Sequence, residues 1–277
     1  MSDLSRRDLL RIAAALSVGP AVLLGTARKK IPIGVQLYSV GAVAQADLPG
    51  TLAAIKKMGY EAVEFAGYYN RTAKQLRQLL DDNGLKACGT HIQLDTMAGD
   101  KLPPTIEFNQ VLGNRFLIVP SLPKTNTSSL DAWAKTADAF NAIAAKLKPL
   151  NMAVGYHNHT DEFAPLEGQV PMDYFFGRTS RDVIMQLDVG HCVRAGADPV
   201  AYLKKFAGRA RSVHVKEWSS TKQAYVVGEG DVKWPAVFAA CEMVGGTEWY
   251  VIEEETRAFQ GAEGIEKSIQ SLKKLLA

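Results

Sequence analysis

Residues 183–206, VIMQLDVGHCVRAGADPVAYLKKF, carry the pattern that decides the fold. The run from Val183 to Leu187 is almost entirely apolar and predicts a strand that is buried on both faces. Asp188 and His191 follow this run directly, and the stretch from Pro199 to Phe206 predicts an amphipathic helix. The segment is therefore interpreted as one β-strand, one polar loop and one α-helix.

The same unit recurs along the chain. Strands are predicted at residues 33–38, 62–65, 85–90, 116–119, 153–156, 183–187, 212–215 and 249–252. Helices are predicted at residues 48–58, 72–83, 129–148, 172–177, 199–206, 234–244 and 262–276, with a further helix near residue 104. Repeated strand–helix units imply right-handed crossovers and a parallel sheet. Because no G-x-G-x-x-G follows the first strand, and because the length suits eight such units, we expect residues 28–277 to form a single (β/α)8 TIM barrel rather than a doubly wound sheet.

The first 27 residues have a different character. Ser5-Arg6-Arg7-Asp8-Leu9-Leu10 is followed by an apolar run from Ile12 to Leu24 and then by small residues. These are the parts of a twin-arginine export signal, so residues 1–27 predict the twin-arginine export machinery as a partner and a periplasmic or secreted protein. The apolar run is too short for a stable membrane span. An amphipathic first helix and an uncleaved N-terminal anchor are the alternatives.

The charge of the chain is close to balanced. Its formal net charge is +3, and no block of lysine or arginine occurs in the body of the sequence. Proteins that bind nucleic acid or a membrane surface usually carry a basic stripe. The composition therefore predicts no nucleic-acid partner.

Polar side chains collect where the predicted strands end. They are Gln36 and Tyr38, Glu64, His91, His157 with His159 and Glu162, Asp188 with His191, His214 with Lys216, and Glu253 with Glu255. The list contains all five histidines of the protein. In a barrel the C-terminal ends of the strands meet at one mouth, where active sites lie. This clustering is the strongest sign of function in the sequence.

The residue types at this mouth indicate a metal site. Two imidazoles and two carboxylates suit Mn²⁺, Co²⁺, Fe²⁺, Zn²⁺ or Ni²⁺, whereas Mg²⁺ and Ca²⁺ prefer oxygen ligands alone. Such a cation polarises a carbonyl group, and a nearby carboxylate or histidine can then remove the proton from the neighbouring carbon.

Several short segments resemble one family in their order and spacing. They are Ile33-Gly-Val-Gln-Leu-Tyr-Ser39, Val63-Glu-Phe65, Gly155-Tyr-His-Asn-His159, Leu187-Asp-Val-Gly-His191, Ala195-Gly-Ala-Asp-Pro199, Val213-His-Val-Lys216, Gly228-Glu-Gly230 and Ile252-Glu253. Across nearly the whole of residues 28–277 the chain resembles the xylose isomerase-like TIM barrels, which include the sugar phosphate isomerase/epimerases and are related to endonuclease IV. Inosose dehydratase-like and 3-keto-glycoside-processing members are similar to it at the histidine-rich fifth strand.

The resemblance implies a ligand set. Many members hold a metal with a glutamate, an aspartate, a histidine and a glutamate after strands five to eight, and Asp188, His214 and Glu253 match the last three. His157 stands where the epimerases have glutamate, which puts their two-glutamate proton shuttle in doubt, and Glu162 lies a few residues further on.

The polar residues at the strand ends are assigned to three expected roles, and Glu253 is assigned to two of them. The expected metal ligands are His157, Asp188, His214 and Glu253, with His159 as the alternative to His157. The expected catalytic residues are Glu162, Glu253 and His191. The expected substrate-binding residues are Gln36, Glu64, His91, Lys216 and Glu255. Asp188 could instead cap a helix, and His191 could instead orient Asp188.

The predicted function is a metal-dependent sugar isomerase or epimerase that removes a proton next to the carbonyl of a small sugar or keto-sugar. A lyase or dehydratase that eliminates from a keto-sugar or a 3-keto-glycoside is the first alternative. An endonuclease IV-like phosphodiesterase and a non-catalytic sugar-binding protein are less favoured, and a homo-oligomer is left open.

Overall fold

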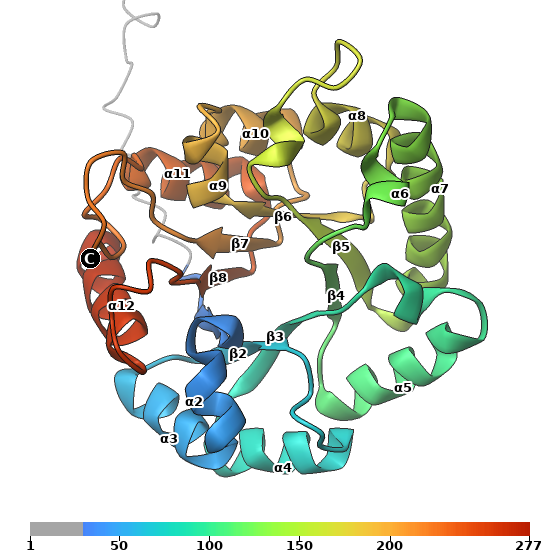
Figure 1. The fold of residues 1–277 in the computed structure, drawn as a ribbon. Coiled ribbons are helices and arrows are strands. Elements are labelled where there is room, and N and C mark those ends of the chain that lie inside the picture. The colour runs from blue at the N-terminus through green and yellow to red at the C-terminus, as the bar shows by residue number, and fades with distance from the viewer. Residues whose placement is uncertain (1–29) are drawn as a thin grey trace, which may run out of the picture. The chain divides into compact units, whose positions relative to one another are not determined.

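The computed structural model describes residues 30–277 of the chain. The predicted export signal, residues 1–27, lies outside these residues. Eight parallel strands, each paired with the next and β8 with β1, close a barrel, as the sequence predicts (Figure 1). The strands are β1 (Ile33–Gln36), β2 (Ala62–Ala66), β3 (Lys86–His91), β4 (Phe116–Val119), β5 (Ala153–His157), β6 (Ile184–Asp188), β7 (Ser212–Val215) and β8 (Trp249–Ile252).

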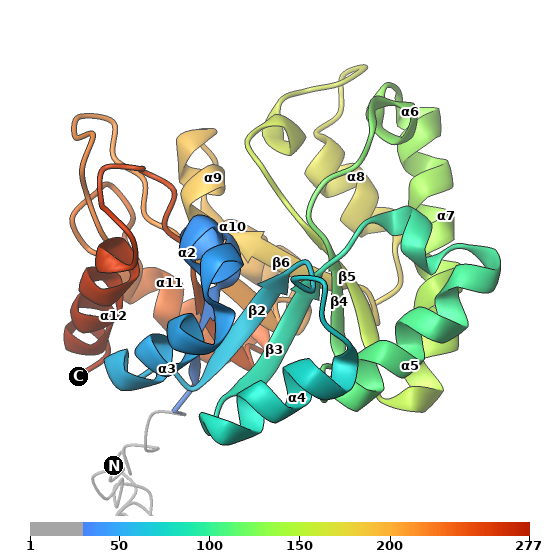
Figure 2. The same ribbon diagram turned by 60° about the horizontal axis from the view of Figure 1, so that its bottom comes forward.

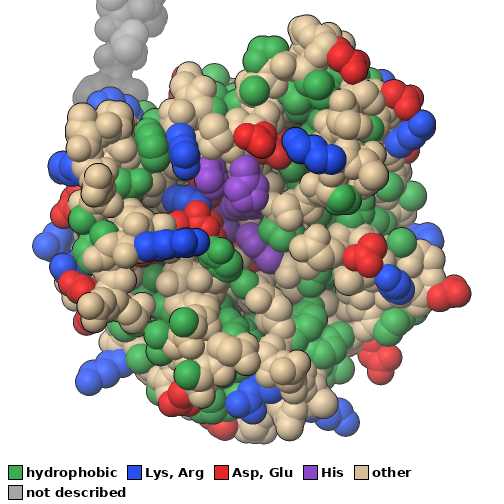
Figure 3. Space-filling view, in the orientation of Figure 1, with side chains coloured by type: hydrophobic (Ala, Val, Ile, Leu, Met, Phe, Trp, Pro, Cys, Tyr) green, Lys and Arg blue, Asp and Glu red, His purple; other side chains and the backbone are tan. Residues whose placement is uncertain are grey.

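Helices surround the strands and connect each to the next (Figure 2). The longer ones match the predicted segments: α3 (Leu48–Met58), α4 (Ala73–Asp82), α5 (Leu102–Leu112), α7 (Leu130–Leu147), α8 (Pro171–Arg178), α10 (Pro199–Lys205), α11 (Trp234–Ala240) and α12 (Glu263–Leu276). Three short helices were not predicted, namely α2 (Gly41–Ala46), α6 (Lys124–Thr127) and α9 (Val189–Arg194). They follow β1, β4 and β6 and so belong to the loops at the C-terminal ends of the strands, the face shown in Figure 3. No helix among residues 30–277 is long and apolar enough to cross a bilayer.

Local sequence explains where the helices begin and end. The Thr72 side chain accepts a hydrogen bond from the backbone N–H of Gln75, and the Gln75 side chain bonds back to Thr72, so the two form a capping box at the start of α4. The Ser129 hydroxyl caps α7 in the same way, through the N–H of Ala132. Helix α3 ends at Gly59, whose φ of 94° is accessible to glycine at no steric cost.

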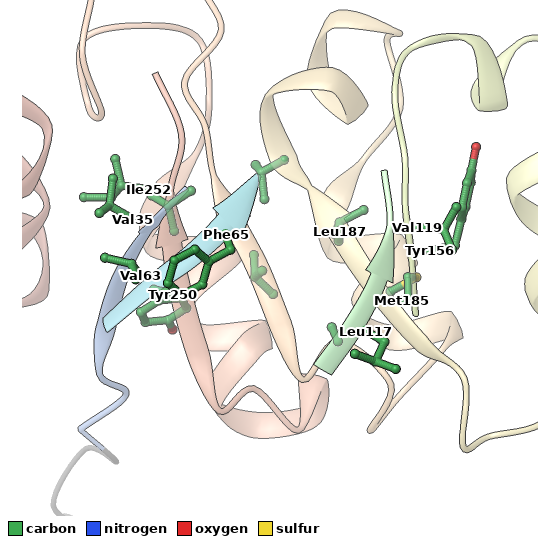
Figure 4. Packing of buried hydrophobic residues seen from close by; sticks show 14 of the residues in the cluster. Val35, Val63, Phe65, Leu117, Val119, Tyr156, Met185, Leu187, Tyr250 and Ile252 are labelled. Carbon is green, nitrogen blue, oxygen red and sulfur yellow. The ribbon is translucent and has the colours of Figure 1, made fainter. Parts of the chain in front are cut away.

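Strand alternation divides the barrel into an outer apolar layer and an interior. Side chains such as Val35, Phe65, Leu187 and Ile252 pack in one cluster with the apolar faces of the helices (Figure 4). The intervening positions point into the barrel, because successive side chains of a strand face opposite ways.

The barrel interior changes character along its axis. Near the N-terminal ends of the strands, Phe116, Ile118, Ala153 and Ile184 form a separate apolar cluster. Towards the C-terminal ends the inward side chains are polar and buried, including Gln36, Glu64, Gln186, Asp188 and His214. Burying polar groups is costly unless they bond to one another. The bonds that these side chains make define the site.

Candidate metal centre and substrate pocket

Four side chains from consecutive strands come together at the mouth. His157 ends β5, Asp188 ends β6, His214 lies in β7 and Glu253 follows β8, and one donor atom of each lies within 4.8 Å of the others. Asp188 Oδ2 lies 3.9 Å from His157 Nε2 and 4.0 Å from His214 Nδ1. His214 Nδ1 lies 2.9 Å from Glu253 Oε2. The four predicted ligands thus form one buried group, hereafter the donor group.

The donor group fits a divalent cation. Asp188 Oδ2 is buried and has no hydrogen-bond partner among residues 30–277. Such an oxygen costs free energy unless a positive group or a donor satisfies it. The ring nitrogens of His157 and His214 and Lys216 Nζ lie 3.8–4.0 Å from it, too far for hydrogen bonds. Two nitrogen and two oxygen donors suit a transition-metal ion.

The other carboxylate oxygen of Asp188 has a structural role. Oδ1 accepts a 2.7 Å hydrogen bond from the backbone N–H of His191 and caps α9. The backbone of Asp188 is held in turn by Asn158, whose Oδ1 accepts from the Asp188 N–H at 3.0 Å and whose Nδ2 donates to its carbonyl at 3.2 Å. Asp188 therefore caps α9 through Oδ1, while Oδ2 faces the other members of the donor group.

The two histidines of the donor group have opposite electrostatic environments. Burial lowers the pKa of His157 well below its usual value, and the neighbouring His214 lowers it further, so its nitrogen lone pair is available to a metal. Burial also lowers the pKa of His214, but the Glu64 and Glu253 carboxylates outweigh this effect and raise that pKa to about 10.

The Glu64 carboxylate makes hydrogen bonds to several side chains next to the donor group. Its Oε2 lies 2.6 Å from His214 Nε2 and 3.1 Å from His91 Nε2, and it accepts a 2.8 Å bond from Gln36 Nε2. Its Oε1 accepts a 2.7 Å bond from Gln186 Nε2. Burial raises the pKa of Glu64, but His91 and His214 outweigh burial and lower it strongly. Of the residues predicted to touch substrate, Glu64 and His91 thus lie against the His214 ring, and Gln36 holds Glu64.

Gln186 orients the second histidine. Its Oε1 lies 3.1 Å from His157 Nδ1 and 2.8 Å from His91 Nε2, and His157 Nε2 consequently faces Asp188. No site role was predicted for Gln186 or Asn158. For Gln186 a signal was present in the sequence, because it precedes Asp188 by two residues in a strand and therefore points to the same side.

A buried lysine lies beside the donor group. Lys216 Nζ is 3.8 Å from Asp188 Oδ2, 3.7 Å from Glu253 Oε2 and 3.0 Å from His191 Nε2, and it is bonded to Glu255. Burial lowers the pKa of Lys216, but Asp188, Glu253 and Glu255 outweigh burial and raise it. Burial and the lysine charge lower the pKa of His191 to about 3. The pair is therefore a charged ammonium next to a neutral imidazole.

A cavity of about 110 Å³ opens beside this pair and is lined by His191, Lys216, Glu253 and Glu255. We call it the lysine pocket. Its wall includes Arg194, whose guanidinium carbon lies 4.9 Å from the centre of the Trp218 ring. Figure 3 shows histidine side chains gathered in the hollow at the centre of this face, with acidic and basic side chains next to them.

Glu162 lies outside the donor group. Its Oε1 accepts a 2.6 Å bond from the Tyr156 hydroxyl, and its Oε2 accepts a 2.7 Å bond from the backbone N–H of His159. The His159 ring lies between those of His157 and His191, at centroid distances of 5.0 and 4.8 Å. The structure thus places His157 in the donor group and His159 beside it.

Comparison with known proteins shows which family the chain resembles. The family model described as Xylose isomerase-like TIM barrel matches residues 52–275. An inosose dehydratase from Clostridium beijerinckii is 28% identical over 88 residues, which are 31% of this chain and 29% of that protein. An inosose dehydratase from Lacticaseibacillus casei is 20% identical over 235 residues, 71% of this chain and 78% of that protein.

A solved structure is also similar. The sugar phosphate isomerase/epimerase from Parabacteroides distasonis superposes with a TM-score of 0.74 at 25% identity, over 90% of this chain and 95% of that one. The family match spans the strands that supply the donor group. The chain therefore belongs to the xylose isomerase-like TIM barrel family.

Proposed function

We propose that the protein is a metal-dependent enzyme that removes a proton next to the carbonyl of a sugar or keto-sugar. The observation that carries the proposal is the donor group itself, above all the buried Asp188 oxygen that lacks a hydrogen-bond partner within the described part of the chain. The ion we propose is Mn²⁺, Co²⁺, Fe²⁺, Zn²⁺ or Ni²⁺, because imidazole and carboxylate ligands suit these cations. When bound, it supplies Lewis acidity that makes the C–H next to a coordinated carbonyl more acidic.

The side chains of the lysine pocket supply the other functions. The Lys216 ammonium can donate a hydrogen bond to a substrate oxygen that gains negative charge. His191 Nε2 and the Glu253 carboxylate border the same pocket and are the proposed sites of proton transfer. Glu162 would first have to release its bonds from Tyr156 and His159, so its role as a base remains a prediction.

Removal of this proton can lead to three products. Return of a proton to the same carbon gives an epimer, and return to the neighbouring carbon gives an isomer. Loss of a group beta to the carbonyl gives elimination. The lyase alternative is favoured by one observation: β5 supplies His157 to the donor group where the epimerases of the family carry a glutamate. The name inosose dehydratase of the curated relatives agrees with it.

Two other functions have less support. A second donor combination within residues 30–277, His91 with His157 and His214, shares two members with the first and is not independent of it. An endonuclease IV-like phosphodiesterase would need separate donors for several ions. A sugar-binding protein without activity would not need a buried lysine, Lys216, next to the three carboxylates of Asp188, Glu253 and Glu255.

We also propose that residues 1–27 direct the protein through the twin-arginine pathway to the periplasm or the medium. Arg6→Lys combined with Arg7→Lys should keep the protein in the cytoplasm. Cell fractionation followed by immunoblotting tests this expectation, and unchanged export of the double variant would contradict it.

Solvent exchange tests the proposed reaction. The protein is loaded with Mn²⁺ or Co²⁺, incubated in D₂O with a panel of ketoses and keto-glycosides, and the recovered sugars are analysed by NMR. Deuterium should appear at the carbon next to the carbonyl and should not appear after chelation. The product identifies epimerase, isomerase or lyase. Absence of exchange from every sugar with the metal bound would refute proton abstraction.

A further inference from the structure

We infer that Thr160 is a positioning residue, which holds the His191 ring with Nε2 free of a proton and turned towards the lysine pocket. This role rests on the proposed function, in which His191 Nε2 is a site of proton transfer. Thr160 would act through His191 and not on the substrate itself. No role was predicted for Thr160 from the sequence.

A second row of polar side chains follows the same four strands as the donor group. Each member lies two or three residues beyond the donor-group residue of its strand, and the members are Thr160, His191, Lys216 and Glu255. Thr160 Oγ1 lies 3.2 Å from His191 Nδ1, and His191 Nε2 lies 3.0 Å from Lys216 Nζ. Lys216 is bonded in turn to Glu255. One chain of hydrogen bonds therefore links the loops that follow β5, β6, β7 and β8.

The lysine sets the direction of these bonds. An ammonium group has three N–H donors and no acceptor, so Lys216 can only donate to the His191 ring. Nε2 must then accept and carries no proton, and the proton of the neutral ring is on Nδ1. Nδ1 consequently donates to Thr160 Oγ1. The opposite tautomer would place the Nε2 N–H against the ammonium at 3.0 Å, donor against donor.

The Thr160 hydroxyl is available for this bond because it does not cap a helix. Thr160 is the N-cap residue of a short 3₁₀ helix, Asp161–Phe163, and a threonine at such a position commonly accepts a hydrogen bond from the backbone of the next turn. Within the described chain the Thr160 side chain makes no capping bond. Its oxygen is directed at the His191 ring instead.

The turn that carries Thr160 is tied to β5. The Glu162 carboxylate accepts a 2.7 Å bond from the backbone N–H of His159, the residue before Thr160. Its other oxygen accepts a 2.6 Å bond from the hydroxyl of Tyr156, which belongs to β5. The Thr160 oxygen therefore has a defined place relative to β5, and the His191 ring is held against it.

This arrangement suits a proton transfer at Nε2. The backbone N–H of His191 is fixed by its bond to Asp188, and Thr160 fixes the ring, so the lone pair of Nε2 keeps one direction. When Nε2 takes the proton from the carbon next to the carbonyl, the ring becomes an imidazolium with an N–H on each nitrogen. Thr160 Oγ1 accepts from Nδ1 in both states, so the ring need not turn. The Lys216 N–H that is displaced from Nε2 becomes free for the substrate oxygen that gains negative charge.

NMR of the histidine rings reads the tautomer directly. The full chain is labelled with ¹⁵N in its histidines and loaded with Zn²⁺, and the His191 signals are assigned by their loss in His191→Gln. The parent protein should carry the ring proton on Nδ1 and none on Nε2. The Nδ1–H signal should persist in Thr160→Ser, which keeps the hydroxyl, and should broaden through exchange with water in Thr160→Val, which has similar size and no acceptor. A proton on Nε2 of the parent, or an equally sharp Nδ1–H signal in Thr160→Val, would overturn the inference.

The kinetics of deuterium exchange test the consequence for the reaction. Thr160→Val should lower kcat by about 10–100-fold, the effect of losing one hydrogen bond to a ring that becomes charged, and should leave KM nearly unchanged. Thr160→Ser should retain most of the parental kcat. A parental kcat in Thr160→Val, or an equal loss in Thr160→Ser, would overturn the role of Thr160. The proposed tautomer without exchange in the parent would refute only the proposed reaction, whereas exchange by a parent protein with the proton on Nε2 would refute only the positioning role.

Discussion

His214 Nε2 and Glu64 Oε2 lie 2.6 Å apart, although 150 residues separate them in the chain. This contact turns the other ring nitrogen, Nδ1, towards Asp188 and Glu253. A carboxylate behind a ligating histidine fixes the orientation of the ring and increases its basicity. Glu64 is thus placed to position His214 for a metal.

Replacing Glu64 with glutamine tests this role. Glu64→Gln keeps the shape of the side chain and removes its charge, so His214 loses the carboxylate that orients it. The affinity for Mn²⁺ should fall by roughly 10–100-fold, the usual effect of losing such a partner. Competition titration with a metal indicator measures this affinity.

Glu248→Gln is the matched control. Glu248 precedes β8 at the opposite end of the barrel and pairs with Arg115 and Arg211. Its replacement should leave the Mn²⁺ affinity unchanged. If both variants bind Mn²⁺ as the parent does, Glu64 has no part in holding the metal site.

The fold could be predicted because its signals are local. Each strand is a short apolar run, and each long helix has a recognisable pattern or cap, so the structure reproduces the predicted strands to within about two residues. The donor group could be predicted for a related reason. Parallel strands bring their C-terminal ends to one mouth whatever the details of the loops.

The network behind the donor group depends on contacts that spacing does not encode. Glu64 meets His214 across the barrel, and which inward side chains meet depends on barrel stagger and rotamers. The same holds for Glu162, whose bonds to Tyr156 and His159 follow from the path of the loop after β5. Helix α9 has only six residues, too few to show an apolar period.

Asp188→Asn should separate the two roles of this side chain. Asparagine can still cap α9 through its side-chain oxygen, but it no longer offers a negative charge to a cation. The variant should therefore remain folded and should lose bound metal, and it should not show the rise in Tm that we expect Mn²⁺ to cause in the parent. Metal content by mass spectrometry and thermal unfolding with and without Mn²⁺ measure these effects.

Asp198→Asn serves as the comparison for Asp188→Asn, because Asp198 caps α10 through the N–H of Val200 and lies at the surface. It should keep the full metal content. An Asp188→Asn protein that still bound one equivalent of metal would remove Asp188 from the ligand set.

Gly190→Ala should disturb the lysine pocket by steric contact alone. A Cβ at this position would lie 2.8 Å from the carbonyl oxygen of Lys216 and 3.0 Å from that of Glu217. Helix α9 and the segment after β7 would have to move apart, which should cost about 1–3 kcal/mol in the free energy of unfolding and lower kcat/KM. Urea denaturation and the exchange assay measure the two effects.

Gly177→Ala is the control for Gly190→Ala, because a Cβ at this helical position meets no such close contacts. Among residues 30–277, no atom outside its own helix turn lies within 4 Å of a Cβ added to Gly177, which is exposed in α8. Its unfolding free energy should change by no more than about 1 kcal/mol, in the stabilising direction. Equal stability and activity of both alanine variants would show that the close packing at Gly190 is dispensable.

The loop between β7 and α11 depends on the buried carboxylate of Glu217. Its Oε1 accepts backbone bonds from Trp218 at 3.0 Å and Val232 at 3.2 Å. Its Oε2 accepts from the backbone of Gly228 at 2.7 Å and from the indole of Trp234 at 2.6 Å. Glutamine would place an NH₂ group against two of these donors, so Glu217→Gln should destabilise the loop by about 1–3 kcal/mol.

Limited proteolysis reports on this loop directly, because cleavage within residues 218–233 requires it to open. Glu217→Gln should be cut there faster than the parent, and the lysine pocket, part of whose wall is this loop, should bind sugar more weakly. Glu229→Gln is the matched substitution in the same loop: Glu229 is exposed, and its side chain accepts one backbone bond, from Val226. It should be cut at nearly the parental rate. If Glu217→Gln is cut at the same rate as the parent protein, contacts other than the four bonds to this carboxylate hold the loop and close the lysine pocket on that side.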